Sequence, residues 1–274
     1  MNLAKLIADI QNVDPEFEDR ISPRRSVIKN MAQMGANVAL AALPLAFGSL
    51  LNKAYGQTEA DVNDVLNFAL TFEYLEAWFY NQGLLQANLI PNADKAYFTA
   101  IAAHENEHVS FLKSALGSNA VPSPKFDLTA KGVFEDVLSN YDTYLAVANA
   151  LEDTGVRAYK GQLVKLMGNQ IILTAAMQIH SVEARHASAI RYLRMNRGVN
   201  ISPWITGSAT VFNDTGIAAF NANYIGENNL VQAGIDITTL KGLNGTVSSS
   251  TAVEAFDEPM DKASVLNILS LFTA

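Results

Sequence analysis

Two glutamate and histidine pairs in this sequence have the spacing of metal ligands. Glu105 and His108 stand three residues apart in the stretch HENEHVSF, and Glu183 and His186 stand three apart in HSVEARHASAIRYL. Residues three apart on a helix lie on one face, with Cβ atoms about 5–6 Å apart, so each pair can bind one ion. Carboxylate oxygen and imidazole nitrogen are donors that suit iron and manganese. The two stretches therefore predict metal chemistry.

An internal repeat supplies two further glutamates. Glu73 precedes Tyr80 by seven residues, and Glu152 precedes Tyr159 by seven residues. Each of these glutamates also precedes the glutamate of one Glu-x-x-His pair, by 32 residues in the first half and by 31 in the second. The agreement of both spacings predicts that the two halves have the same structure.

Long helices are needed to position these side chains, and the sequence predicts them. Apolar residues recur at three- and four-residue spacing, and turns are marked by Pro91 and Gly168. Gly155 is expected to loosen the third helix. We expect helices over residues 58–85, 88–117, 141–167 and 169–198, and a short amphipathic piece over 132–140. This is an all-α arrangement of two helical hairpins joined by a longer crossover.

Equal distances from the hairpin turns bring the candidate ligands to one level of a four-helix bundle. Glu73 and Glu105 each lie sixteen residues from a turn near residue 89, or about 24 Å along the axis at the standard helical rise. Four carboxylates and two imidazoles buried at one level would cost several kcal/mol per charge unless cations neutralise them. We therefore predict two iron or two manganese ions, with the metal ligands Glu73, Glu105, His108, Glu152, Glu183 and His186.

Other polar residues near these positions have two interpretations. Glu76, one turn from a predicted ligand, is expected to be a partly solvated neighbour rather than a ligand. His104 is expected to be an ordinary structural histidine. His180 either orients a carboxylate or relays protons, or is simply structural. Tyr80 and Tyr159 are core aromatics or hydrogen-bond a ligand close to the centre.

Composition bounds the possible classes of protein. The 274 residues are 49% hydrophobic, with 16 glycines and 8 prolines, which indicates a globular chain with a sizeable core and one main domain plus extensions. The 27 acidic residues outnumber the 19 basic ones, so nucleic acid is not an expected partner. The absence of cysteine excludes disulfides, thiolate ligands and cysteine nucleophiles, and leaves oxygen and imidazole as metal donors.

The N-terminal segment resembles a twin-arginine export signal. Arg24 and Arg25 lie in SPRRSVIK, ahead of a charge-free apolar run over residues 31–51. Val27 departs from the pattern, since phenylalanine is common there. The alternative is an uncleaved membrane anchor over residues 31–51, because about 20 residues span a bilayer. We favour export to the periplasm or outside the cell, with the twin-arginine export machinery as a partner.

Residues 58–197 resemble a ferritin-like di-metal carboxylate domain. The resemblance is carried by LNFALTFEYLEAWFY and VEARHASAIRYLR. With the signal-like segment, these stretches further resemble bacterial ferritin-like proteins that are grouped with plant desiccation-related proteins. The resemblance implies a ferritin-like four-helix bundle and the same six metal ligands, but it does not define a reaction.

Three parts of the chain are expected. They are an export signal and linker over residues 1–56, the bundle over 57–199, and an irregular C-terminal extension over 200–274. The extension has no repeat, phosphate-binding loop or nucleophile motif. It is expected to pack on the bundle through a last helical segment, by the residues Leu266, Ile268, Leu269 and Phe272.

Three functions are compatible with these patterns. The leading hypothesis is an exported redox enzyme whose di-iron or di-manganese centre reacts with oxygen or hydrogen peroxide, in protection against oxidative or desiccation stress. The second is a metal-binding or iron-storage protein without turnover. The third is a structural, stress-associated protein of the cell envelope. A homo-oligomer is compatible with each of them.

Overall fold

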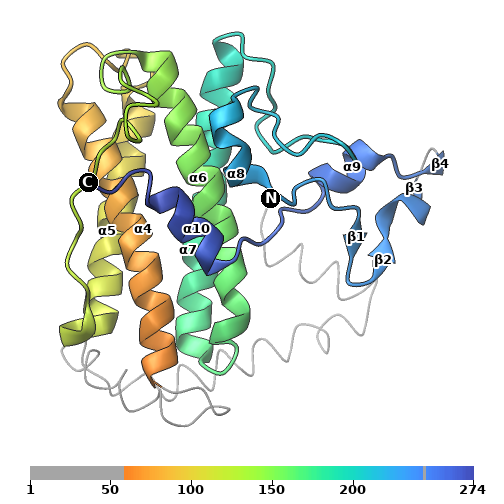
Figure 1. Ribbon diagram of the computed structural model, residues 1–274, viewed down its shortest axis with the longest axis horizontal. Helices are drawn as coiled ribbons and strands as arrows, with labels where there is room; N and C mark the ends of the chain where they lie inside the picture. Colours follow the sequence, from red (N-terminus) through yellow and green to blue (C-terminus); the bar gives the residue numbers. More distant parts are fainter. Residues whose placement is uncertain (1–58, 243–244) are drawn as a thin grey trace, which may run out of the picture. The chain divides into compact units, whose positions relative to one another are not determined.

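The computed structural model describes residues 59–242 and 245–274 (Figure 1). The expected export signal over 1–56, with the apolar run over 31–51, lies outside the described residues. Of the helices in the described part of the chain, none combines the length and apolar character needed to cross a bilayer.

Four long helices form two antiparallel hairpins. Helix α4 (Glu59–Leu85) packs along α5 (Lys95–Leu116), and α6 (Tyr141–Leu163) packs along α7 (Gln170–Asn196). In Figure 1 these four helices lie side by side, coloured from orange to teal. The two helical hairpins predicted from the sequence are therefore confirmed.

The helix ends follow from local side chains. Asn140 begins α6 by accepting a hydrogen bond from the backbone N–H of Asp142 at 3.0 Å, and Asn169 begins α7 by accepting one from Ile172 at 3.1 Å. Helix α5 begins at Lys95 and not at residue 88 as expected, because Pro91 disfavours helical backbone before it. The predicted helical piece over 132–140 consists of turns instead.

Short elements complete the described chain. The tail contains the helices α8 (Asn221–Tyr224), α9 (Ser249–Glu254) and α10 (Lys262–Leu269), and single 3₁₀ turns lie at Gly117–Asn119, Val164–Leu166, Ala218–Phe220 and Ile237–Thr239. Two antiparallel hairpins pair β1 (Val231–Gln232) with β2 (Ile235–Asp236), and β3 (Lys241–Gly242) with β4 (Gly245–Thr246). The tail thus has the irregular character expected of residues 200–274, with two small β-hairpins among its short helices.

The last helical segment docks on the bundle largely as predicted, with one residue different. Leu266 is 39% exposed, so its predicted role in docking is wrong. Val265 is fully buried in its place, and Ile268, Leu269 and Phe272 are buried as predicted. Val265, Ile268 and Leu269 form one stripe of α10, which does not include Leu266, and Phe272 packs just after the helix ends.

Buried ion pairs fasten the tail to α6 and α7. Arg157 of α6 lies 2.6 Å from a carboxylate oxygen of Glu227 and donates hydrogen bonds to the carbonyls of Ile225 and Glu258. Arg191 of α7 pairs in the same way with Asp153 and with Asp214 of the tail, at 2.6 and 2.9 Å. The tail is therefore held by charge as well as by apolar packing.

We predict that Arg157→Ala lowers the free energy of unfolding by about 3–5 kcal/mol, because it leaves a buried carboxylate unpaired. Urea unfolding followed by circular dichroism measures the change. Arg197→Ala is the matched control, since the pair of Arg197 with Asp142 is exposed to solvent and is expected to contribute less than about 1 kcal/mol. Equal losses in the two variants would contradict the role of Arg157 as a tail anchor.

Candidate metal centre

The six predicted ligand side chains converge inside the bundle. One glutamate comes from α4, one from α6, and one Glu-x-x-His pair from each of α5 and α7. All six side chains are buried, and none exceeds 9% exposure. The six side chains thus lie at one level of the bundle, and metal binding by them stays a prediction.

Their donor atoms form two overlapping groups. Glu73, Glu105, His108 and Glu183 make up one group, and Glu105, Glu152, Glu183 and His186 make up the other. Within each group, one donor atom from every residue lies within 4.8 Å of the others. Because Glu105 and Glu183 belong to both groups, they stand where carboxylates bridging two ions would stand.

The imidazoles contact the carboxylates directly. The Nδ1 atom of His108 lies 3.1 Å from Glu73 and from Glu105, and 3.3 Å from Glu183. The Nδ1 atom of His186 lies 2.7 Å from Glu105 and 3.4 Å from Glu152. Each histidine therefore has one nitrogen directed at the carboxylates of its own group.

The two repeat tyrosines bond across the bundle. The hydroxyl of Tyr80 on α4 donates to Glu152 on α6, and the hydroxyl of Tyr159 on α6 donates to Glu73 on α4. The seven-residue spacing in each helix thus places the tyrosine hydroxyl where it reaches the glutamate of the other hairpin. Of the two interpretations left open for these tyrosines, the hydrogen bond to a predicted ligand is the one observed.

Burial and crowding shift the pKa values of the cluster. Burial raises the pKa of Glu73 to about 8, although the hydrogen bond with His108 opposes the shift. Burial and neighbouring carboxylates raise the pKa of Glu183 well above its usual range. Burial disfavours the charged form of Glu105 too, but hydrogen bonds with His108 and His186 outweigh it and lower its pKa to about 2.

Unpaired atoms show that the cluster fits cations. Both carboxylate oxygens of Glu76 and one oxygen of Glu183, Oε2, are buried without a hydrogen-bond partner. The other oxygen of Glu183 and one oxygen of Glu152 lie 3.3 and 3.4 Å from a histidine nitrogen without forming a hydrogen bond. Buried polar atoms without partners are costly, and native proteins normally pair them. Oxygen and nitrogen donors that converge in this way fit iron or manganese ions, which would satisfy several of them at once.

Glu76 corrects the sequence-based expectation. Its side chain is fully buried, not partly solvated. Gly155 explains how it fits, because a Cβ atom on that residue would lie 3.2 Å from Glu76 Oε1 and 2.9 Å from Glu183 Oε2. Gly155 lies inside the continuous helix α6, so its role here is to leave room for carboxylates and not to loosen the helix.

The two remaining histidines differ in their distance from the candidate ligands, and His104 departs from its expected structural role. His104 is exposed, but its Nδ1 atom lies 2.9 Å from Nε2 of His186 and the two rings stack. Metal-binding histidines commonly have such a partner on the second ring nitrogen. His180 instead has its Nδ1 atom 3.1 Å from the carbonyl of Val156, which is the structural alternative for this residue. The sequence position of His180, one turn before Glu183, did not indicate this contact with Val156.

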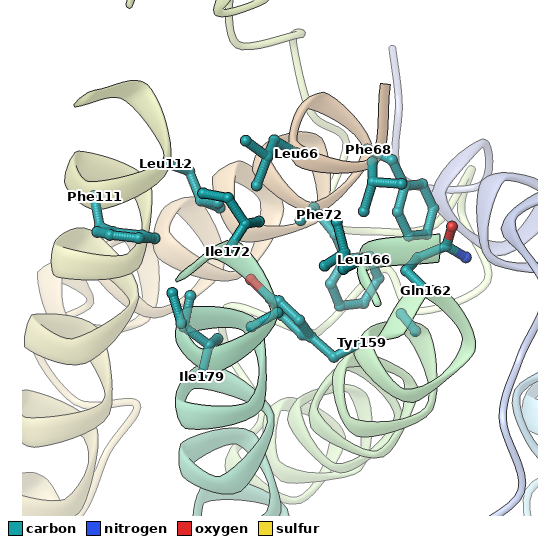
Figure 2. Close-up of a pocket in the computed structure, with 15 residues that line it drawn as sticks. Leu66, Phe68, Phe72, Phe111, Leu112, Tyr159, Gln162, Leu166, Ile172 and Ile179 are labelled. Atoms are coloured by element: carbon teal, nitrogen blue, oxygen red, sulfur yellow. The ribbon is translucent and has the colours of Figure 1, made fainter. Parts of the chain in front are cut away.

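An apolar pocket lies between the long helices, and Tyr159, which bonds Glu73, forms part of its wall (Figure 2). Its walls come from all four long helices and include Phe72, Leu112, Tyr159 and Ile179. Apart from Tyr159 and Gln162, the lining side chains are hydrocarbon. The pocket therefore offers water few hydrogen-bond partners, whereas a small apolar molecule needs none.

Comparison with known proteins agrees with the geometry. Residues 61–196 match the family described as a ferritin-like domain, and this span runs from α4 to the end of α7. No curated protein matches the chain significantly.

We predict that rising pH lowers the stability of the metal-free protein and raises its affinity for metal. The pKa of Glu73 is raised from 4.5 to about 8 and that of His186 from 6.5 to about 11, so the native state binds more protons than the unfolded chain. Stability of the metal-free protein should therefore fall as the pH rises from about 5 to about 8. Metal competes with these protons, so metal affinity should rise over the same range.

Thermal unfolding with and without manganese checks this prediction. The increase in melting temperature on adding metal should grow with pH across that range. Glu105, whose pKa is lowered to about 2, contributes stability that is lost only at more acidic pH and does not reverse the trend. A metal-free protein that becomes more stable with rising pH would contradict these shifts.

Proposed function

Residues 61–196 of this chain are a ferritin-like domain, and from that premise we propose that it binds two iron or two manganese ions and performs redox chemistry on a small oxidant. The observation that carries the proposal is the pair of overlapping donor groups, which share Glu105 and Glu183. Four carboxylates carry four negative charges, which balance two divalent ions. Bound iron or manganese would supply one-electron oxidation and reduction.

The protein side chains would hold and orient this centre. Glu73 with His108, and Glu152 with His186, are the terminal pairs in the two groups. Each tyrosine hydroxyl holds one oxygen of Glu73 or Glu152, and the other oxygen of each glutamate faces the histidine of its own group, where it would bind metal. The contact of His104 with His186 fixes that ring from the solvent side.

The apolar pocket supports oxygen over hydrogen peroxide as the oxidant. Dioxygen is apolar and enters a hydrocarbon cavity at little cost, whereas peroxide loses its hydrogen bonds to water there. The pocket begins next to Tyr159, whose hydroxyl bonds Glu73. We propose that oxygen reaches the predicted centre through this pocket.

The N-terminal segment and the resemblance to desiccation-related proteins support the wider part of the proposal. The paired arginines Arg24 and Arg25 before an apolar run are typical of proteins exported by the twin-arginine machinery. We accordingly propose three parts, over residues 1–56, 57–199 and 200–274, and a role outside the cytoplasm in protection against oxidative or desiccation stress. Storage without turnover needs a closed cage of subunits, and the tail docked on α6 does not favour one.

We predict that Glu105→Gln reduces the metal content from about two ions per chain to less than one, because this residue belongs to both donor groups. Elemental analysis of purified protein, after exposure to ferrous iron or manganese, measures the content. Glu107→Gln is the matched control, since it makes the same change at an exposed position of the same helix. Unchanged loading of Glu105→Gln would refute the proposed centre.

We also predict that the iron-loaded protein is oxidised faster by oxygen than by an equal concentration of peroxide. Ala176→Leu fills part of the pocket and should slow the oxygen reaction several-fold without changing the iron content. Stopped-flow absorbance measures both rates, with Ala100→Leu on the exposed face of α5 as the control. Preference for peroxide, or no effect of Ala176→Leu, would count against the pocket as the oxygen path.

A further inference from the structure

Glu76 is a fifth buried carboxylate at the predicted metal centre, and it has no partner. Its side chain is fully buried on α4, and neither of its carboxylate oxygens has a hydrogen-bond partner. Glu73, three residues earlier on the same helix, by contrast bonds both His108 and Tyr159. A carboxylate buried without a donor is ionised only where a positive group lies nearby, and otherwise keeps its proton.

The opposite helix leaves space for this carboxylate. A Cβ atom on Gly155 would meet Glu183 Oε2 and Glu76 Oε1, so these two oxygens face one point on α6 from two other helices. Gly155 follows Glu152 by three residues, as Glu76 follows Glu73. The two halves of the repeat therefore differ at this position. One half has the carboxylate of Glu76, and the other has Gly155, which lacks a side chain and leaves room for that carboxylate.

The charge balance of the predicted centre indicates a role for this difference between the two halves. The four carboxylates in the two donor groups balance two divalent ions. The carboxylate of Glu76 adds one negative charge in the same buried volume. That charge is balanced when one divalent ion loses one electron and becomes trivalent, the electron passing to an oxidant such as dioxygen.

We propose that Glu76 is an additional metal-binding carboxylate, which binds beside Glu183 and stabilises the oxidised state of one ion. The inference rests on the proposed function, because it requires a bound metal pair. It makes the two metal positions unequal, since one side of the centre has a carboxylate where the other has Gly155. It also goes beyond the six ligands that the repeat predicts.

The test compares the iron-loaded wild-type protein with Glu76→Gln, which keeps the shape of the side chain and removes its charge. Redox titration with mediators measures the one-electron potential, and Mössbauer spectroscopy measures the difference between the two iron positions. Both proteins should hold two irons. The equilibrium constant for oxidation should fall at least tenfold in Glu76→Gln, which raises the potential by about 59 mV, and the two iron signals should become more alike.

Exposed Glu107→Gln makes the same change in net charge and should alter neither measurement. Two bound irons with an unchanged potential and spectrum in Glu76→Gln would overturn the role of Glu76 and leave the proposed function intact. A wild-type protein that binds no metal would overturn both.

If Glu76→Gln loses iron while circular dichroism shows unchanged helix content, a second variant tests the proposal. Glu76→Asp keeps the charge on a shorter side chain. Recovery of iron binding in Glu76→Asp supports a metal-binding carboxylate, and continued loss of iron overturns the proposal.

Discussion

The burial of negative charge inside a four-helix bundle is the constraint on which the rest of this structure depends. Carboxylates enter the core from all four helices, and only two imidazoles accompany them in the donor groups. Such a cluster is unfavourable unless hydrogen bonds, protons or cations compensate it. The raised pKa values of Glu73 and Glu183 show the cost in the absence of metal, and the converging unpaired oxygens show where metal would relieve it.

Near two-fold symmetry between the hairpins organises this compensation. Tyr80 and Tyr159 each bond the glutamate of the other hairpin, so the two halves hold each other's carboxylates in place. Departures from the symmetry are confined to a few positions. Glu76 faces Gly155, and His104 contacts His186. The predicted centre is therefore symmetric in its tyrosine and glutamate contacts, and its two sides differ at Glu76 and at His104.

The tail stabilises the bundle through contacts with α6 and α7 that do not involve the candidate metal ligands. Buried Arg157 and Arg191 bind tail groups on the side of α6 and α7, and the apolar stripe of α10 packs beside them. The sequence indicated that this segment docks, but assigned Leu266 to the wrong face. Periodicity over eight residues leaves the rotation of a short helix poorly defined, because only contact with the bundle selects the stripe that is buried.

Sequence alone determined which six side chains would meet and at what level of the bundle, because the helical rise and the three-residue spacing are set by backbone hydrogen bonds. Tertiary structure decided the partners. The burial of Glu76, the pairing of His104 with His186 and the crossed tyrosine bonds all depend on how neighbouring helices are rotated and how closely they approach. Those quantities arise from packing between segments distant in the chain, and the periodicity of one helix does not contain them.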